Sequence, residues 1–320
     1  MFYQRDLENV LFSDFSAEEI DNVVVISGYL GFQPIEKLSK LKDKKSIVIY
    51  GMYGKDSIAF PHHKKYLEID AKNANLDILY STEPVHAKIY FGISNNIIKF
   101  VKVGSANFSS SGLKNDGKEV LVDVDPKLFD DIKQYYDLVK ANCIPCQEGT
   151  YKKIPKKNNK RITSKSQNKV YRCCLLSFLG IDKKTKEKIV PKMSGLNWCH
   201  STKGNVSKND AYIPIRIPDI KNNPGLFPPK KQTNQIVELI WDDETSMDGL
   251  LEGTNDIDGV SYPKQLCSSP RKSTMGEYLR KRLNVSPSKV IDIDDLKKYG
   301  RSDVSVTLIA DGVYYLDFSV

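Results

Sequence analysis

The segment HAKIYFGISNNIIKFVKVGSANFS, residues 86–109, carries two short polar motifs separated by apolar, β-branched sequence. Ser-Asn-Asn at residues 94–96 lies between two apolar runs, and this arrangement is typical of a β-hairpin. We therefore expect strands over residues 86–91 and 97–103. The hairpin would bring the motif at its beginning beside the motif at its end.

Four polar side chains are expected to meet at this end of the hairpin. Side chains two residues apart on a strand project from the same face, so His86 lies beside Lys88 and Ser105 lies beside Asn107. An imidazole, an ammonium, a hydroxyl and an amide at one point provide a nucleophile and the donors that neutralise the non-bridging oxygens of a phosphodiester. Glu119 opens the next expected strand, where its carboxylate would fix the tautomer of the imidazole. These five residues form the predicted catalytic site.

The first 140 residues alternate strand and helix patterns. Short, apolar, β-branched runs predict buried strands, and segments with helical character separate them. Besides the hairpin, strands are expected at 23–27, 46–50, 76–80 and 119–124, and helices at 34–41, 61–73 and 126–142. Such alternation predicts an α/β sheet with helices on its faces. His62 and His63, which precede two lysines in the second helix, are interpreted as surface charge.

Length and charge set limits on the organisation of the chain. Its 320 residues suit two domains, and 48 basic against 40 acidic residues leave a formal charge of +8, which is compatible with a polyanionic partner. Residues 151–172 carry nine Lys or Arg and no acidic residue, which is typical either of a solvated hinge or of an arm that contacts phosphate groups. We expect a domain at 1–150, this basic linker, and a domain at 173–320.

From residue 173 the pattern becomes mostly β. Many short strands with few helices are typical of a small barrel or pseudobarrel. Strands are expected at 173–179, 211–217, 235–241, 305–309 and 313–318, and helices at 275–283 and 293–299.

The cysteines and the apolar segments indicate a cytoplasmic protein. Six cysteines occur without a signal-peptide-like N-terminus, and no apolar run reaches about 18 residues, so reduced thiols and no membrane contact are expected. Cys143 and Cys146 form one C-x-x-C, but no second pair stands at finger spacing, which favours ordinary thiols over a zinc or redox site. No carboxylate cluster suits magnesium, so neither a metal nor another cofactor is expected in this chain.

His86-x-Lys88, followed by Gly104-Ser105-x-Asn107, resembles the HKD motif of the phospholipase D superfamily. The resemblance implies that His86 attacks phosphorus and forms a covalent phosphohistidine. It also implies that the lysine, serine and asparagine hold the phosphate and that no metal takes part.

Three further points follow from the resemblance. Glu119 stands where the family has a glutamate that supports the histidine. The family often has an aspartate five residues after the lysine, whereas this chain has Ile93, and the nuclease branches often lack that aspartate. Only one such motif is present, and because the chemistry needs both a nucleophile and an acid, we expect a homodimer whose two motifs meet across a twofold axis.

The second half is similar to the recognition domain of phospholipase-D-type restriction endonucleases of the NgoFVII kind. These pair a single-HKD domain with a pseudobarrel like the B-three DNA-binding domain of plant transcription factors. The resemblance implies an α/β phospholipase-D-like sandwich domain, then a mostly-β, B-three-like pseudobarrel, with double-stranded DNA as the substrate. It is carried by residues 195–198, 211–215, 264–266, 276–280, 299–301 and 315–318, with 27–29 in the first half.

Two polar loops of the second half are candidate DNA contacts. Arg and Lys suit guanine edges, Asn and Gln suit adenine, and all of them reach phosphate. The alternative is that these are ordinary solvated loops, which any barrel has. The candidates are Asn197, His200, Lys203, Asn205, Lys208 and Asn209 in one loop, and Lys264, Gln265, Arg271 and Lys272 in the other.

The favoured function is a sequence-specific, metal-independent double-strand DNA endonuclease of a restriction-modification system. A repair or other nuclease without sequence preference is the alternative. A phospholipid-processing enzyme would usually carry two HKD motifs and a membrane anchor, and a decayed nuclease would not keep the catalytic set intact. The resemblance further implies a cognate cytosine methyltransferase and a helicase-like ATPase as separate proteins, since this chain has no Walker motif, and a GC-rich recognition site.

Overall fold

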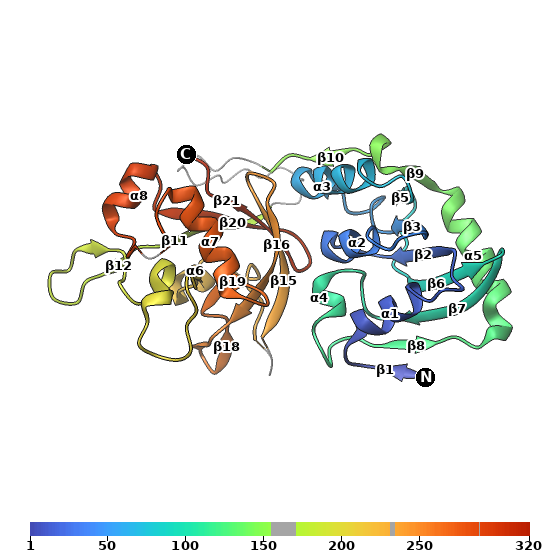
Figure 1. Ribbon diagram of the computed structural model, residues 1–320, viewed down its shortest axis with the longest axis horizontal. Coiled ribbons are helices and arrows are strands. Elements are labelled where there is room, and N and C mark those ends of the chain that lie inside the picture. The colour runs from blue at the N-terminus through green and yellow to red at the C-terminus, as the bar shows by residue number, and fades with distance from the viewer. Residues whose placement is uncertain (155–170, 231–233, 288) are drawn as a thin grey trace. The chain divides into compact units, whose positions relative to one another are not determined.

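The computed structural model describes residues 1–154, 171–230, 234–287 and 289–320. The chain divides into two compact units, residues 1–168 and 169–320, and each is described by itself (Figure 1). Most of the predicted basic linker, residues 155–170, lies outside the described residues. In the described part of the chain, no helix is both long and apolar enough to cross a membrane.

A mixed sheet forms the centre of the first unit (Figure 1). Three strands run parallel, and the strands on either side of them are antiparallel to their neighbours. In sheet order the strands are β1 (Phe2–Tyr3), β8 (Leu121–Asp123), β7 (Ile97–Gly104), β6 (Lys88–Ser94), β2 (Asn22–Ser27), β3 (Lys45–Tyr50), β5 (Leu76–Ser81) and β9 (Cys143–Pro145). The predicted α/β sheet is therefore confirmed.

Helices pack on both faces of this sheet. On one face, Tyr136 and Val139 of the last helix join a core cluster with apolar side chains of β2, β3, β6 and β7. On the other face, Tyr66 contacts Tyr50 of β3, and Phe15 contacts Phe100 of β7. The helices are α1 (Leu7–Phe15), α2 (Phe32–Leu38), α3 (Phe60–Ala71), the short α4 (Ser110–Leu113) and α5 (Phe129–Ala141), which a 3₁₀ turn at Pro126–Leu128 precedes.

The first unit differs from the expected pattern in small ways. Helix α1 was not expected, and the single helix expected over 126–142 is a 3₁₀ turn followed by α5. Near the end of the unit, β10 (Tyr151–Lys152) pairs with β4 (Ile58–Ala59), and a 3₁₀ turn covers Cys146–Glu148.

The predicted hairpin is formed by β6 and β7. Asn95 and Asn96 make its turn with φ angles of 49° and 64°, in the left-handed region that asparagine tolerates better than most residues. Strand β6 begins at Lys88 rather than at His86, because its neighbour β2 ends directly opposite, at Ser27. Ile89, one residue further on, is buried against α5, as expected for the face opposite Lys88.

A seven-stranded, mostly antiparallel sheet forms the second unit. Its first and last strands contact each other, so the sheet is curled into a nearly closed barrel, and the predicted pseudobarrel is confirmed. In sheet order the strands are β11 (Arg172–Ser177), β20 (Asp303–Ala310), β21 (Val313–Asp317), β15 (Gln235–Trp241), β16 (Ser246–Glu252), β19 (Gln265–Ser268) and β14 (Ile213–Pro214).

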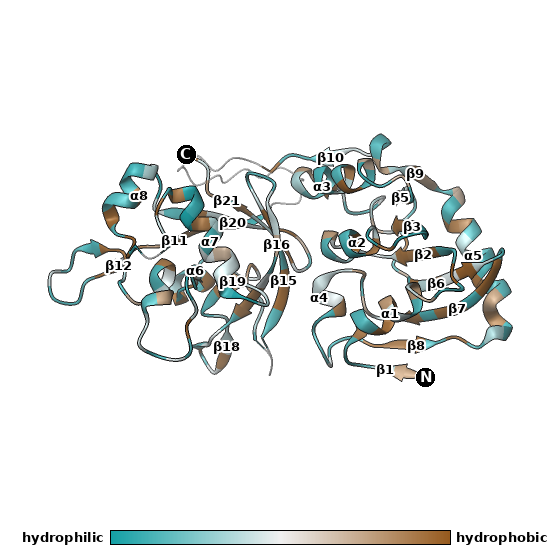
Figure 2. Ribbon diagram, in the orientation of Figure 1, coloured by the Kyte–Doolittle hydropathy of each residue, from teal (hydrophilic) through white to brown (hydrophobic). Residues whose placement is uncertain are grey.

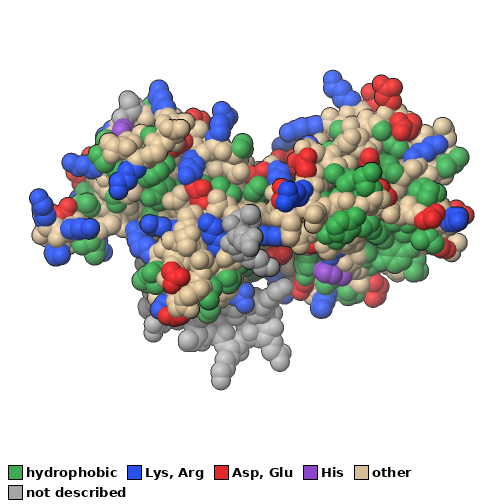
Figure 3. Space-filling model, turned by 90° about the horizontal axis from the view of Figure 1, so that it is seen from below, with side chains coloured by type: hydrophobic (Ala, Val, Ile, Leu, Met, Phe, Trp, Pro, Cys, Tyr) green, Lys and Arg blue, Asp and Glu red, His purple; other side chains and the backbone are tan. Residues whose placement is uncertain are grey.

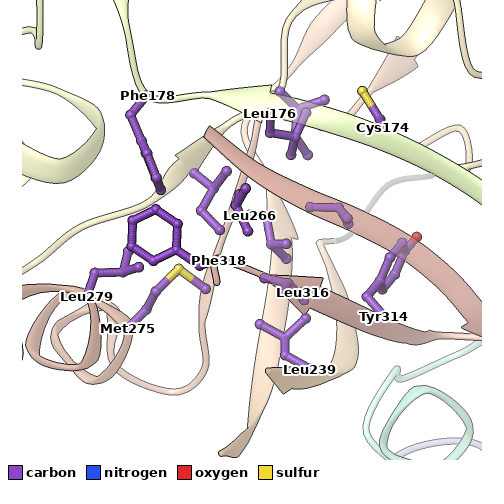
Figure 4. Packing of buried hydrophobic residues seen from close by; sticks show 14 of the residues in the cluster. Cys174, Leu176, Phe178, Leu239, Leu266, Met275, Leu279, Tyr314, Leu316 and Phe318 are labelled. Carbon is purple, nitrogen blue, oxygen red and sulfur yellow. The ribbon is translucent and has the colours of Figure 1, made fainter. Parts of the chain in front are cut away.

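The barrel has its own apolar core. Leu176, Leu239 and Leu316 point into it from three strands, Phe318 joins them just after β21, and Met275 of a flanking helix lies against them (Figure 4). Figure 2 shows the same distribution in each unit, with strands mostly hydrophobic and the outer parts of helices hydrophilic. The remaining elements are η3 (Gly195–His200), α6 (Ile217–Lys221), α7 (Lys272–Leu283), α8 (Ile293–Tyr299) and the small ribbons β12 (Gly180–Ile181) with β13 (Lys188–Ile189) and β17 (Asn255–Ile257) with β18 (Val260–Tyr262).

The predicted elements of the second half agree in part with the structure. The strand expected at 235–241 and the helix expected at 293–299 have the bounds of β15 and α8. The strand expected at 211–217 is wrong as a single element, because only the pair Ile213–Pro214 lies in the sheet before α6 begins at Ile217. Strands β16 and β19 were not expected.

Candidate active site

The predicted catalytic residues of the first unit lie where β2 ends and β6 begins. Lys88, the first residue of β6, pairs directly with Ser27, the last residue of β2. At the same end of the sheet, Gly104 of β7 pairs with Leu121 of β8, and the segments that carry Ser105 and Glu119 leave from there. The carboxyl ends of parallel strands are where α/β proteins usually place their ligand sites.

His86 and Lys88 lie against each other. The Lys88 ammonium donates to the His86 backbone carbonyl at 2.8 Å and lies 3.2 Å from Nδ1 and 3.1 Å from Nε2 of the imidazole. Lys88 is buried, with 7% of its surface exposed, whereas His86 is exposed to solvent. The imidazole is thus accessible while the ammonium beneath it is held in place.

Electrostatics favour the neutral form of the imidazole. Burial, the charge of Lys88 and the charge of Lys55 all lower the pKa of His86. Burial also lowers the pKa of Lys88, and the carboxylate of Glu119 opposes that shift. An imidazole that stays neutral at pH 7 keeps the lone pair with which it can attack phosphorus.

Gly28 forms the floor beneath this pair. A Cβ atom at this position would lie 2.7 Å from Cδ2 of His86 and 3.2 Å from the ammonium nitrogen of Lys88. Since carbon atoms in contact normally lie about 3.5–4.0 Å apart, any side chain here would displace the imidazole. In the sequence, Gly28 stands out only as part of the resembling segment 27–29, because its role depends on a residue distant in the chain.

Asn107 is oriented by the turn that follows β2. Its side-chain oxygen accepts a hydrogen bond from the backbone N–H of Tyr29 at 3.2 Å, so the amide nitrogen is left to donate toward a ligand. Ser27 joins the same segments, since its hydroxyl donates to the Tyr29 carbonyl at 2.7 Å and accepts from the Phe108 N–H at 2.9 Å. Ser27 was expected only as part of the resembling segment 27–29, because the partners of its fully buried hydroxyl cannot be read from the sequence.

Ser105 and Glu119 lie at the edge of the site. The hydroxyl of Ser105 accepts a hydrogen bond from the backbone N–H of Val120 at 3.1 Å, and Ser105 itself is exposed. The charge of Glu119 acts on Lys88 and on the phenol of Tyr90. Among the described residues, no hydrogen bond joins Glu119 to His86, so its predicted support of the imidazole stays a prediction.

The interpretation of His62 and His63 as surface charge is wrong. They are 1% and 3% exposed, and each bonds to a buried tyrosine hydroxyl: His62 to Tyr66 at 2.8 Å and His63 to Tyr80 at 3.0 Å. Burial lowers the pKa of both, to about 3 for His62. Both are neutral core residues at pH 7.

The candidate DNA contacts of the second unit fall into two groups. Figure 3 shows Lys and Arg side chains over much of the surface of this unit on the face drawn. The exposed candidates, which are free to meet DNA, are Lys203, Asn205, Lys208, Lys264 and Arg271. His200 is half-buried, and Asn209 is buried with a φ of 69°.

Asn197 requires a correction. It is fully buried, its amide nitrogen donates to the carbonyls of Pro191 at 3.1 Å and Ile291 at 2.7 Å, and its oxygen accepts from the Ile291 N–H at 2.8 Å. Every hydrogen-bonding atom that a base would need is therefore already used inside the barrel. The structure gives Asn197 a packing role instead of the predicted base contact.

Gln265 and Lys272 share one acidic partner. The carboxylate of Glu252 accepts a hydrogen bond from the Gln265 amide nitrogen and lies 2.5 Å from the Lys272 ammonium. This ion pair lowers the pKa of Glu252 and raises that of Lys272, both against the effect of burial. Both candidates are thus held on the surface of the barrel in defined orientations.

The six cysteines are free thiols in the structure. Cys143 is half-buried and Cys146 is buried. Burial raises their pKa values to about 11 and about 12, respectively, so both thiols stay protonated at pH 7.

Two family models match the chain. Residues 5–151 match the NgoFVII restriction endonuclease N-terminal PLD domain, and residues 175–310 match the NgoFVII C-terminal B3-like DNA-binding domain. The matches fall on the two units in the predicted order, a phospholipase-D-like domain followed by a B3-like domain. No curated protein matches the chain.

Several solved structures are similar to the first unit at low identity. NucT from Helicobacter pylori matches with a TM-score of 0.35 and 22% identity, covering 45% of this chain and 97% of that chain. Nuc from Salmonella typhimurium, a phospholipase D family member, matches with a TM-score of 0.30 and 16% identity, covering 42% and 88%. Phosphatidylserine synthase from Haemophilus influenzae matches with a TM-score of 0.35 and 11% identity, covering 47% and 40%.

Proposed function

Since the chain belongs to the NgoFVII restriction endonuclease family, we propose that it cuts double-stranded DNA at a defined sequence, without a metal, through a phosphohistidine at His86. Family membership makes it a phosphodiesterase of the restriction endonuclease type with a DNA-binding domain. The proposal adds the chemical step, the independence from metal, and the place of the enzyme in a restriction-modification system.

The observation that carries the proposal is an accessible, neutral imidazole seated against an ammonium. In the first step, a ring nitrogen of His86 forms a bond to phosphorus, the bond from phosphorus to the leaving oxygen breaks, and that oxygen takes up a proton. In the second step, water attacks phosphorus and gives up a proton, and the bond to the imidazole breaks. Lys88 and the amide nitrogen of Asn107 donate to the non-bridging oxygens, whose charge grows in each transition state.

The leaving oxygen needs an acid on the side of phosphorus opposite the nucleophile. Of the four histidines of the chain, His62 and His63 are buried, and His200 belongs to the second unit. We propose that a second copy of the chain supplies its own His86 as this acid, which makes the active enzyme a homodimer. Light scattering at the working concentration tests this, and an active monomer contradicts it.

Independence from metal follows from this assignment, because Lys88 and Asn107 meet the phosphate charge and the nucleophile is a side chain rather than an activated water. Digestion of a plasmid of known sequence in EDTA tests both halves of the proposal. Discrete fragments in EDTA are expected. A smear indicates the alternative, a nuclease without sequence preference, and cutting that disappears in EDTA and returns with magnesium contradicts the mechanism.

Two partner proteins belong to the proposal as well. A cognate cytosine methyltransferase would protect the recognition site, and a helicase-like ATPase would act as a separate subunit. If such an ATPase is required, that subunit needs Mg-ATP, and EDTA would remove the magnesium. The EDTA experiment then tests only the cleavage step, with EDTA added after the ATPase has acted. Bisulfite sequencing of host DNA at the cut sites tests the methyltransferase.

A further inference from the structure

A segment that the catalytic motif does not include forms one wall of the site. Residues 51–56 follow β3 and are tied to the chain on two sides. The N–H groups of Gly51 and Met52 donate to the carbonyls of Ser27 and Gly28 at 2.9 and 3.0 Å. On the other side, Val85, the residue before His86, donates to the Gly51 carbonyl at 2.8 Å. This wall therefore lies against both the floor of the site and the segment that carries His86.

Gly54, which belongs to the wall, contacts the start of the segment that leads from β5 to His86. Its N–H donates to the Ser81 carbonyl at 3.0 Å, and a Cβ atom at this position would lie 1.9 Å from the Thr82 carbonyl oxygen. Only glycine permits the two backbones to come this close. The position of the wall relative to His86 is thus set by backbone contacts and not by adaptable side chains.

A side-chain contact fixes the far end of the wall. The hydroxyl of Tyr29 donates to the Asp56 carboxylate at 2.5 Å, and the Tyr29 ring lies edge-on to the His86 ring with centroids 5.8 Å apart. Lys55 stands between Gly54 and Asp56, which are both fixed, and its side chain is exposed. Its charge reaches the catalytic imidazole, since it is one of the causes that lower the pKa of His86.

We propose that Lys55 is a further phosphate-binding residue, which contacts a phosphate next to the scissile one on the same DNA strand. The inference rests on the proposed function, because it assumes that DNA is bound at His86. A DNA strand carries one phosphate for about every 3.4 Å of helix axis, so placing one phosphate at His86 brings its neighbours against the walls of the site. Lys55 offers an exposed ammonium on a fixed backbone at such a wall.

The same strand provides a matched control. Lys45 is also exposed, but it is the first residue of β3, whereas Lys55 follows the last residue of that strand. Lys45 therefore lies at one end of β3, and Lys55 lies in the segment that leaves the other end. The active site is only at the Lys55 end. Lys55→Gln and Lys45→Gln remove the same charge from the same unit.

The test measures kcat and KM for DNA cleavage by the full-length chain at several salt concentrations. Lys55→Gln is expected to raise KM about five- to tenfold and to reduce the slope of log(kcat/KM) against log[salt] by about 1, the effect of one lost phosphate contact. Lys45→Gln is expected to keep the wild-type slope. On bis(p-nitrophenyl) phosphate, which has a single phosphate, the loss caused by Lys55→Gln is expected to be several-fold smaller than on DNA.

Three results are decisive. A Lys55→Gln variant with the wild-type salt slope overturns the inference. Equal fold-losses on DNA and on the single-phosphate diester also overturn it, because Lys55 would then act only through His86. A wild-type chain that cuts neither DNA, with the ATPase subunit supplied where it is required, nor the single-phosphate diester refutes the proposed function first and removes the basis of the inference, which distinguishes the two failures.

Discussion

The environment of His86 is set by three neighbours, of which only Lys88 belongs to the same motif. The ammonium of Lys88 lies within 3.2 Å of both ring nitrogens, Lys55 adds a second positive charge, and Gly28 leaves the space that the ring occupies. Burial and the two charges favour a neutral imidazole, and the space above Gly28 is where its ring lies. At the residue scale, the candidate site is therefore defined by the residues that surround the His86 side chain.

The first prediction concerns the pH dependence of cleavage. The pKa of His86 is lowered by burial and by the charges of Lys88 and Lys55, and only the neutral imidazole can attack. Activity is therefore expected to fall as the pH decreases, with this acid-side midpoint of kcat/KM below the ordinary histidine value of about 6.5. It is also expected to fall at higher pH, because the His86 of the second copy must be protonated to act as the acid. A pH profile of kcat/KM for the wild type checks this. An acid-side midpoint above about 6.5 contradicts the assignment of the neutral His86 imidazole as the nucleophile.

The second prediction concerns the floor of the site. Gly28→Ala places a methyl group 2.7 Å from the imidazole carbon Cδ2, so the ring must move. Because a displacement of about 1 Å can reduce catalysis about 10²-fold, we expect a loss of this order in kcat with little change in the melting temperature. Calorimetry and single-turnover cleavage check both parts. A variant of wild-type activity would show that the ring is not confined by the floor.

Residue types and their spacing predicted the candidate catalytic set but not the residues that support it. His86, Lys88 and Asn107 carry a spacing that a strand converts into one face, so sequence reasoning reaches them. Gly28 and Ser27 belong to the resembling segment 27–29, but their contacts with His86 and Phe108 join residues distant in the chain, so their roles were not predicted. Asn197 was misjudged because its hydrogen-bond partners are backbone groups of Pro191 and Ile291, and Ile291 is distant in the chain.

At the scale of elements, periodic patterns were predictive where they were long. The buried β-branched run of β2 and the alternating hairpin strands were found because tertiary contacts agree with local preference. Helix α1 was missed although Leu7, Leu11 and Phe15 follow a helical period, since it has only nine residues and Asp6 before it makes no side-chain cap. Strand β16 was missed because a glycine stands between its inward residues, Met247 and Leu251, and interrupts the alternation.

The third prediction concerns the element η3 in the barrel. Asn197→Ala leaves the Pro191 carbonyl and both backbone groups of Ile291 without their buried partners, so we expect the second unit to lose about 2–3 kcal/mol of stability. Asn205→Ala is the control, since Asn205 is exposed and its loss is expected to change stability by less than about 0.5 kcal/mol. Urea unfolding of the full chain checks both. A stable Asn197→Ala protein with weakened DNA binding would restore the base-contact prediction.

At the scale of the whole molecule, the chain separates chemistry from recognition. Each unit has its own sheet and its own apolar core, and the predicted catalytic residues all belong to the first. The two family matches assign a phospholipase-D-like domain to the first unit and a DNA-binding domain to the second. Cleavage and DNA binding are therefore expected to respond to different substitutions.

The fourth prediction follows from this separation. His86→Ala is expected to reduce cleavage by about 10³-fold or more, because it removes the nucleophile, and to leave specific DNA binding within about twofold of the wild type. A gel shift on a cleaved sequence, with Lys203→Gln as a binding-defective comparison, measures the second part. Parallel loss of binding and cleavage in His86→Ala would mean that the two units do not work separately.

The central claim is that His86 becomes covalently bonded to phosphorus, and trapping the intermediate tests it most directly. The wild-type chain is mixed with DNA that carries ³²P at the scissile phosphate, in EDTA, and denatured within the first turnover. The account predicts a label on the protein that is stable to alkali, labile to acid, located in the peptide that contains His86, and absent from His86→Ala. DNA cleavage by the wild type with no label on the protein at any time during the first turnover would contradict the account.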